Sequence, residues 1–175
     1  MKKCKNCKEV FKPMRSNLEK YCSKPECIKV WVDTEKQKQW NKRKSEMKKD
    51  LMSLQDYIKI AQTHFNHFIR LRDSGNDCIS CGKKPLKKNA GHFFNANNHY
   101  SVRFDERNVH LQCEHCNTFL SGHLIPYREN LISKIGQEEF DNLSSIAKET
   151  RNFTIDEVKE IADIYKKKVK EFKNN

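Results

Sequence analysis

Hydrophobic residues recur every three or four positions in two parts of the chain, and this spacing predicts amphipathic helices. The first helix is expected over residues 54–72, with Ser53 as its N-cap and Asp73 as the first residue of its C-terminal stop signal. The second begins after Thr154, and the three-residue step to Glu157 predicts a capping box. Its apolar stripe consists of Ile155, Val158, Ile161, Ala162, Tyr165, Val169 and Phe172.

Two further segments are compatible with helices. Residues 127–147 are expected to form a helix that is broken at Gly136. Residues 34–50 are rich in Lys and Arg, and Trp31 and Trp40 lie among these basic residues. Such a run is either a solvated face or a surface that contacts DNA, and the sequence leaves both open.

The composition limits how much of the fold can depend on apolar packing. Hydrophobic residues make up 36% of the 175 residues and charged residues 33%, so the chain needs support from cross-links or metals. The first residues do not resemble a signal peptide, and we see no apolar run long enough to cross a membrane. We therefore expect a cytoplasmic protein, in which paired cysteines hold metal more often than they form disulfides.

The eight cysteines are spaced as two sets of four zinc ligands. A CxxC pair supplies two thiolates from one tight turn, and two such pairs complete a tetrahedral Zn²⁺ site. With four thiolates each, these zincs would be structural and closed to substrate. The alternative, a redox-active CxxC pair, needs a βαβ context that we do not see. The first set is Cys4, Cys7, Cys22 and Cys27, and the second is Cys78, Cys81, Cys113 and Cys116.

The charge balance suggests a polyanionic partner. The chain carries 35 basic and 23 acidic residues, which gives a formal net charge of +12. An excess of this size together with zinc modules favours nucleic acid as the partner. Solubility alone is the alternative explanation.

The second cysteine set encloses a further pattern. His92 lies on a short apolar strand after the first pair, Asn108 precedes a second strand, and Asn117 directly follows Cys116. This order resembles the HNH (ββα-metal) nuclease superfamily, and most closely its tetracysteine subset with Asn as the third motif residue. The wider sequence resembles the phage NinG (Rap) family, the recombination endonucleases of lambda-like phages. The stretches that carry the resemblance are 65–73, 78–82, 90–92, 103–110 and 112–122.

The resemblance implies an architecture and an activity. We expect an α+β, mainly helical chain with an N-terminal Cys4 zinc module (1–30), a basic helical linker (31–52) and an HNH-like nuclease domain with flanking helices (53–175). The implied activity is a structure-specific endonuclease of phage recombination that cuts branched DNA, such as D-loops and Holliday junctions, in the cytoplasm of a bacterial host cell.

The chemistry of phosphodiester hydrolysis assigns roles to the motif residues. His92 would act as general base on the attacking water, because imidazole titrates near working pH. Asn117 would offer a carbonyl oxygen to a catalytic Mg²⁺ or Mn²⁺. By resemblance, Asn108 orients the loop and ring of His92. Arg103 and Arg107 are basic side chains that could hold phosphates. In the alternatives without catalysis, His92 is a structural or solvent-facing residue and Asn117 caps the helix of the zinc knuckle.

One position departs from the family pattern. Many of these nucleases have an acidic metal ligand directly before the catalytic His, and Gly91 stands there in this chain. Asp105, His110 and His123 are candidates to replace that ligand, and His110 is preferred because it shares a strand face with Asn108.

Two other functions remain open at the level of sequence. One is a less selective HNH nicking or restriction-type nuclease. The other is a non-catalytic zinc-finger DNA-binding protein, which the missing acidic ligand supports best. A homodimer is also expected, with the helices between residues 127 and 172 as its interface, since enzymes that cut two strands symmetrically often pair.

Overall fold

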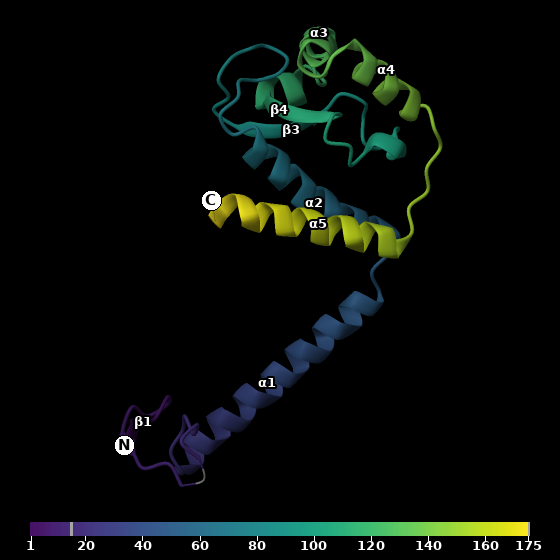
Figure 1. Cartoon of the computed structure of the whole chain (residues 1–175). Helices are drawn as coiled ribbons and strands as arrows, with labels where there is room; N and C mark the ends of the chain where they lie inside the picture. The colour runs from purple at the N-terminus through teal and green to yellow at the C-terminus, as the bar shows by residue number, and fades with distance from the viewer. Residues whose placement is uncertain (15, 175) are drawn as a thin grey trace. The chain divides into compact units, whose positions relative to one another are not determined.

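The computed structural model describes residues 1–14 and 16–174, and the chain divides into two compact units, with the boundary between Met52 and Ser53 (Figure 1). Helices and short strands are mixed, with more residues in helices, as expected. None of the helices formed by the described residues has an apolar stretch of sufficient length to traverse a lipid bilayer.

The first unit is built around its cysteines. Strands β1 (Lys2–Lys3) and β2 (Val10–Phe11) pair antiparallel across the first CxxC turn, and helix α1 (Pro25–Asp50) follows. The buried cluster consists of Cys4, Cys22 and Cys27, with Cys7, Phe11 and Tyr21 packed against it. This unit therefore has almost no apolar core apart from its cysteines.

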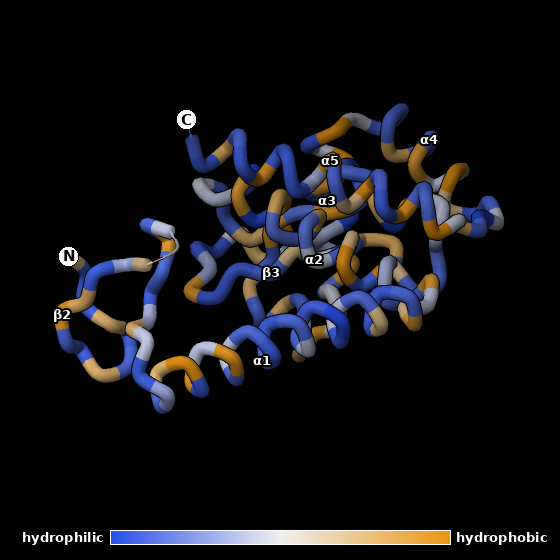
Figure 2. Tube along the Cα trace, turned by 90° about the horizontal axis from the view of Figure 1, so that it is seen from below, coloured by the Kyte–Doolittle hydropathy of each residue, from blue (hydrophilic) through white to orange (hydrophobic). Residues whose placement is uncertain are grey.

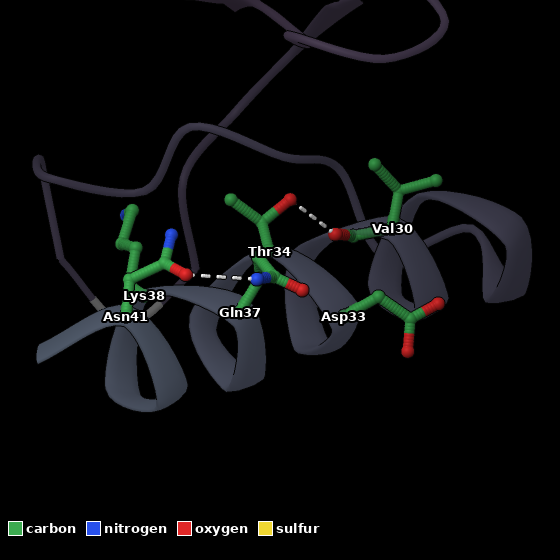
Figure 3. Close-up of a pocket in the computed structure, with 6 residues that line it drawn as sticks. All are labelled: Val30, Asp33, Thr34, Gln37, Lys38 and Asn41. Atoms are coloured by element: carbon green, nitrogen blue, oxygen red, sulfur yellow. Dashed lines mark hydrogen bonds between the residues drawn. The ribbon is translucent and has the colours of Figure 1, made fainter. Parts of the chain in front are cut away.

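Helix α1 is longer than the segment predicted from residue 34 onwards, because it begins at Pro25, and proline is favoured in the first helical turn. Cys27 is the buried residue among the described positions of α1, and Figure 2 shows a mainly hydrophilic helix. Local side-chain bonds support it, such as Thr34 Oγ1 to the Val30 carbonyl (2.6 Å) and Gln37 to Asn41 (2.9 Å) (Figure 3). The stability of α1 beyond its first turn thus depends on such local pairs.

Two long helices form the base of the second unit. Helix α2 (Leu54–Arg72) has the predicted bounds, and Ser53 caps it through a capping box with Asp56. Helix α5 (Ile155–Asn174) begins with the predicted box between Thr154 and Glu157. The helices lie side by side and run in the same direction (Figure 1). Interlocking aromatic rings join them, with Phe65 and Tyr165 centroids 4.8 Å apart.

A β-hairpin lies between this helical pair and a second helical layer. Strand β3 (Lys88–His92) pairs antiparallel with β4 (Val109–Cys113), so that Lys88 lies opposite Cys113 and His92 opposite Val109. A 3₁₀ turn, η1 (Tyr100–Val102), lies between the strands, and a π-helical turn, η2 (His115–Phe119), follows β4.

The second layer consists of α3 (Leu124–Ile135) and α4 (Gln137–Ile146), which lie on the other side of the hairpin from α2 (Figure 1). The predicted break at Gly136 is confirmed, with a φ of 87°, although the helix starts three residues earlier than expected. A buried cluster that includes Val102, Tyr127, Leu131, Phe140 and Leu143 joins these helices to the loop after β3.

Candidate functional site

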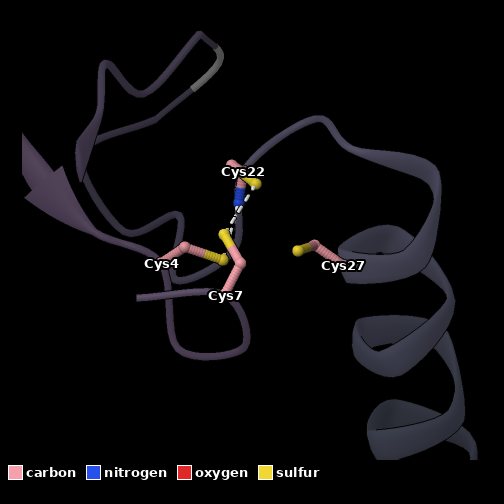
Figure 4. A group of neighbouring side chains, drawn as sticks. All are labelled: Cys4, Cys7, Cys22 and Cys27. Atoms are coloured by element: carbon pink, nitrogen blue, oxygen red, sulfur yellow. Dashed lines mark hydrogen bonds between the residues drawn. The ribbon is translucent and has the colours of Figure 1, made fainter. Parts of the chain in front are cut away.

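The first four cysteines converge on one point (Figure 4). Their sulfur atoms all lie within 4.8 Å of one another, and the Cys7 and Cys22 sulfurs are 3.7 Å apart. Zinc–sulfur bonds of about 2.3 Å place tetrahedral ligands about 3.8 Å apart, so the set fits Zn²⁺. The turn is closed by Lys8, whose N–H donates to the Cys4 carbonyl from a left-handed φ of 64°.

The second set repeats this turn inside the hairpin unit. Gly82 closes it with a φ of 66° and a 2.8 Å bond to the Cys78 carbonyl, and the Cys81 and Cys113 sulfurs lie 3.9 Å apart. The Cys116 N–H points at the Cys113 sulfur, at 3.4 Å. The predicted grouping of the eight cysteines is confirmed, and each set could hold one zinc.

His92 ends β3 with its ring turned toward α2. Its Nε2 lies 3.1 Å from the Arg103 carbonyl oxygen, and its ring centroid lies 6.3 Å from that of Phe65. Because a carbonyl can only accept a hydrogen bond, Nε2 carries the proton and Nδ1 keeps its lone pair. Burial lowers the pKa of His92 to about 4, and the nearby Arg103 charge acts in the same direction. The imidazole is therefore neutral at pH 7, and a pKa this low makes it a weaker base than the histidine titrating near working pH that the sequence led us to expect.

Asn108 is fully buried and closes the loop that follows β3. Its Oδ1 accepts from the Phe94 N–H at 2.8 Å, and its Nδ2 donates to the Phe94 and Val102 carbonyls at 3.0 Å. All three bonds are to backbone atoms, and the side chain is fully buried, so it is not presented to a substrate. These contacts suit a positioning residue for the segment that carries His92.

Asn117 lies in the π-helical turn η2, one residue after Cys116 of the second cysteine set. Insertions of π geometry are frequent at functional sites because they re-aim a side chain. Asn117 is half-buried, and within residues 1–14 and 16–174 its side chain forms no hydrogen bond, either to His92 or to any other group. Its amide oxygen therefore remains available to a ligand.

His110 is unsuited to the metal-ligand role that we expected for it. Its Nδ1 lies 3.0 Å from the Arg72 guanidinium and 3.2 Å from the Lys134 ammonium, while its Nε2 lies 3.1 Å from the Arg107 carbonyl. Both ring nitrogens are engaged, and the two cations would repel a divalent ion. The ring is buried, which lowers its pKa, and it belongs to a network that ties α2 and α3 to β4 around Asp73.

The other two candidates for that ligand are also engaged. Asp105 forms a 2.7 Å ion pair with Arg107. His123 Nδ1 lies 3.7 Å from the Cys116 sulfur, where it can donate to a zinc-bound thiolate. Asp105 is thus neutralised within the protein, and Nδ1 of His123 is turned toward the second cysteine set.

The two arginines predicted to hold phosphates both have internal partners. Arg107 pairs with Asp105 and with Glu139, which neutralises its charge. Arg103 is buried, and its guanidinium donates to Gln62 Oε1 at 2.9 Å and to the Ala96 carbonyl at 3.1 Å. Both residues thus support the loop between the strands, and their geometry argues against the phosphate role.

Sequence reasoning missed Gln62 and Gln112. Gln62 on α2 accepts a hydrogen bond from the Arg103 guanidinium, and the Arg103 carbonyl accepts one from the His92 ring. Gln112 on β4 is fully buried, and its side chain fills the space beside Gly91. The register of the hairpin and the docking of α2 bring these residues together, and no local sequence pattern reports either.

Comparison with known proteins assigns the whole chain to one family. The model of the family described as Bacteriophage Lambda NinG protein matches residues 1–175. Protein ninG of Escherichia phage lambda is 38% identical over 195 residues, which cover 99% of this chain and 94% of the relative. Protein ninG of Salmonella phage P22 is 36% identical over 195 residues, covering 99% and 95%. No solved structure matches. The chain therefore belongs to the NinG family of phage proteins.

Proposed function

We propose that this chain is a metal-dependent endonuclease that cuts branched DNA. The observation that carries the proposal is the state of His92, a neutral imidazole that ends one strand of a cysteine-clamped hairpin. Its Nε2 is tied to the Arg103 carbonyl, and the Nδ1 lone pair is left for a proton.

The expected reaction is in-line attack of water on a phosphodiester. His92 Nδ1 takes a proton from the water as the new phosphorus–oxygen bond forms, and the bond to the leaving oxygen breaks. A divalent Mg²⁺ or Mn²⁺ held by the Asn117 amide oxygen would supply Lewis-acid stabilisation of the charge on the phosphate. The cysteine-bound zincs take no part, because four thiolates leave no open coordination position.

The DNA partner is supported by charge that is not neutralised within the protein. Arg103 and Arg107 are engaged internally, whereas α1 exposes basic side chains along its length together with Trp31 and Trp40. Basic side chains that contact the phosphates of DNA bind it without reading its base sequence. A preference for branched DNA follows only from the family resemblance described above, and it fits a chain with two separate units, since branched DNA presents several backbones at once.

The test is cleavage of a synthetic four-way junction and of a linear duplex with the same sequence, with Mg²⁺ or Mn²⁺. Wild type should cut the junction, and His92→Ala should lose about 10²–10⁴-fold in rate, the usual contribution of a general base. His64→Ala on α2 is the matched control and should cut normally.

Two outcomes would replace the proposal. Equal cutting of junction and duplex would indicate a less selective nuclease. If wild type and His92→Ala bind DNA equally well and neither cuts it with either metal, the protein is a non-catalytic DNA-binding module. Sedimentation velocity with and without the junction tests the proposed homodimer.

A further inference from the structure

The first unit contains a cavity of about 940 Å³ beside its cysteine set. Residues that follow β2 form one wall, and the first turns of α1 form the other. Binding cavities for small ligands have volumes of roughly 300–1,000 Å³, so this one can admit a group of the size of a nucleobase. Its apolar lining consists of Phe11, Met14, Leu18, Tyr21, Ile28 and Trp31.

The wall that follows β2 is held by its own hydrogen bonds. The Met14 N–H donates to Glu19 Oε2 at 2.9 Å. The Lys5 N–H donates to the Lys20 carbonyl at 2.8 Å, which ties the end of this segment to the first CxxC turn. A cavity that is formed before its occupant arrives requires little ordering on binding.

Much of the apolar lining is left open by the protein itself. Trp31 exposes 47% of its surface, Leu18 81% and Met14 85%. Burial of an indole would stabilise a unit that has almost no apolar core, yet the fold leaves this ring accessible. Exposed apolar side chains that gather around a hollow are typical of a binding site, whereas isolated ones are not.

The charge around the cavity indicates the chemistry of its occupant. Residues 1–52 hold 16 basic and 7 acidic residues, a formal net charge of +9 out of +12 for the whole chain. At the cavity Lys38 pairs with Glu35, whereas Lys5, Lys12 and Lys20 form no ion pair among the residues that the structure describes. Cations around an aromatic hollow match a ligand that carries both negative charge and flat rings, and single-stranded nucleic acid combines the two.

We propose that this cavity binds an unpaired base of single-stranded DNA, with Trp31 as its stacking surface. Lys5, Lys12 and Lys20 contact the phosphates. An acidic peptide matches less well, because exposed basic residues continue along α1 beyond the cavity, at 42–44, and a nucleic acid strand carries a charge at every nucleotide. The inference rests on the DNA-binding part of the proposed function and needs no cleavage. It assigns to the first unit the unpaired nucleotides of a branch.

The chain has two tryptophans, so each can be observed alone. In zinc-loaded Trp40→Phe, binding of an oligothymidylate should strongly quench the emission of Trp31, because a base stacks on its ring. In Trp31→Phe, the emission of Trp40, which does not line the cavity, should change much less. Both titrations are made without Mg²⁺ or Mn²⁺, so that cleavage cannot contribute.

The affinity for a labelled oligothymidylate, measured by fluorescence anisotropy, gives the contribution of the ring. Trp31→Ala should weaken binding by about 5- to 150-fold, the usual effect of removing a side chain on which a base stacks. Trp31→Phe keeps an aromatic face and should recover most of the affinity. Trp40→Ala, on the same helix, is the matched control and should bind as wild type does. Equal zinc content establishes that the variants are folded.

Three outcomes would overturn the inference. One is an equal loss of affinity in Trp31→Ala and Trp40→Ala. Another is quenching of Trp31 by a blunt duplex as strong as that by the single strand, which would show contact with the backbone alone. The third is quenching by polyglutamate but not by oligothymidylate, which would indicate an acidic protein partner. In all three cases cleavage of the junction still decides the endonuclease separately, whereas a wild type that binds no DNA would refute both.

Discussion

The two cysteine sets share one turn but rest on very different surroundings. In both, the residue after the second cysteine adopts a left-handed φ near 65° and donates to the carbonyl of the first. The first set is itself the core of its unit, with Phe11 and Tyr21 as its main apolar neighbours. The second set lies in a unit with three hydrophobic clusters. Two of them include residues of both α2 and α5, and the third lies in the α3–α4 layer.

The same metal motif can therefore serve two different purposes. In the first unit, zinc would replace a hydrophobic core, because too little apolar surface is available to offset the entropy of folding. In the second, zinc would clamp a hairpin that is already covered on two sides, and thereby set the positions of His92 and Asn117. The first zinc would make folding of its unit possible, and the second would fix the geometry of the candidate site.

The largest expected effect is the loss of protection from hydrogen exchange when one cysteine of a set is replaced, and it should differ between the two units. In Cys27→Ser, the amides of Cys4 and Lys5 should lose all protection from hydrogen exchange, because coupled zinc binding contributes on the order of 10 kcal/mol. In Cys113→Ser, the nuclease core should unfold around the hairpin, while α2 and α5 retain partial protection. Exchange mass spectrometry together with zinc content measures both. Protected Cys4 and Lys5 amides in zinc-depleted Cys27→Ser would refute the difference between the units.

Acid should affect only the second unit through histidine, since residues 1–52 contain none. Burial lowers the pKa of His92 to about 4 in the folded state, below its ordinary value of 6.5. Between these values the unfolded chain binds a proton that the folded chain does not, so stability falls as pH drops from 6.5 towards 4. The decrease should be on the order of 2 kcal/mol.

Urea unfolding of wild type and His92→Gln at pH 7.5 and pH 5 isolates this contribution. The variant lacks the titrating ring, and contributions from other groups cancel in the difference. An equal decrease of stability in both proteins on acidification would show that His92 is not held neutral by burial.

Binding to DNA should distinguish α1 from the arginines of the hairpin unit. Replacement of Lys42, Arg43 and Lys44 by Ala should reduce the salt dependence of binding, with the slope falling by up to about 0.9 for each phosphate that is no longer neutralised. Arg107→Ala should leave the slope unchanged and lower the melting temperature, because its partners are Asp105 and Glu139. Fluorescence anisotropy from 50 to 200 mM salt measures the slope. A larger decrease of the slope in Arg107→Ala than in the α1 variant would show that Arg107 contacts DNA.

The smallest effects should come from the shared turn itself. Gly82→Ala places a side chain in the left-handed region and should cost about 1 kcal/mol. Lys8→Gly relieves the same strain but adds freedom to the unfolded chain, so its net effect should be within about 0.5 kcal/mol. Zinc competition with a chromogenic chelator compares the two turns. A large gain from Lys8→Gly would mean that the first knuckle is strained beyond its φ angle.

Elements with local causes could be predicted from the order of residues alone. The three- and four-residue spacing of apolar positions defined the bounds of α2, and the Thr154–Glu157 capping box placed the start of α5. The two sets of four cysteines were also readable, because each CxxC turn is specified by its own few residues. Helix α1 was underestimated at its beginning, since a helix with little buried surface leaves little periodicity to detect.

Which polar side chains remain free was settled by packing between distant segments. His110 shares the strand pattern of a ligand, but the docking of α2 and α3 places Arg72 and Lys134 against it. Gln112 has no sequence signature, and it reaches Gly91 only because of the hairpin register. A side chain's availability depends on partners far away in the chain, and the free energy of those pairings is set by tertiary packing rather than by local propensity.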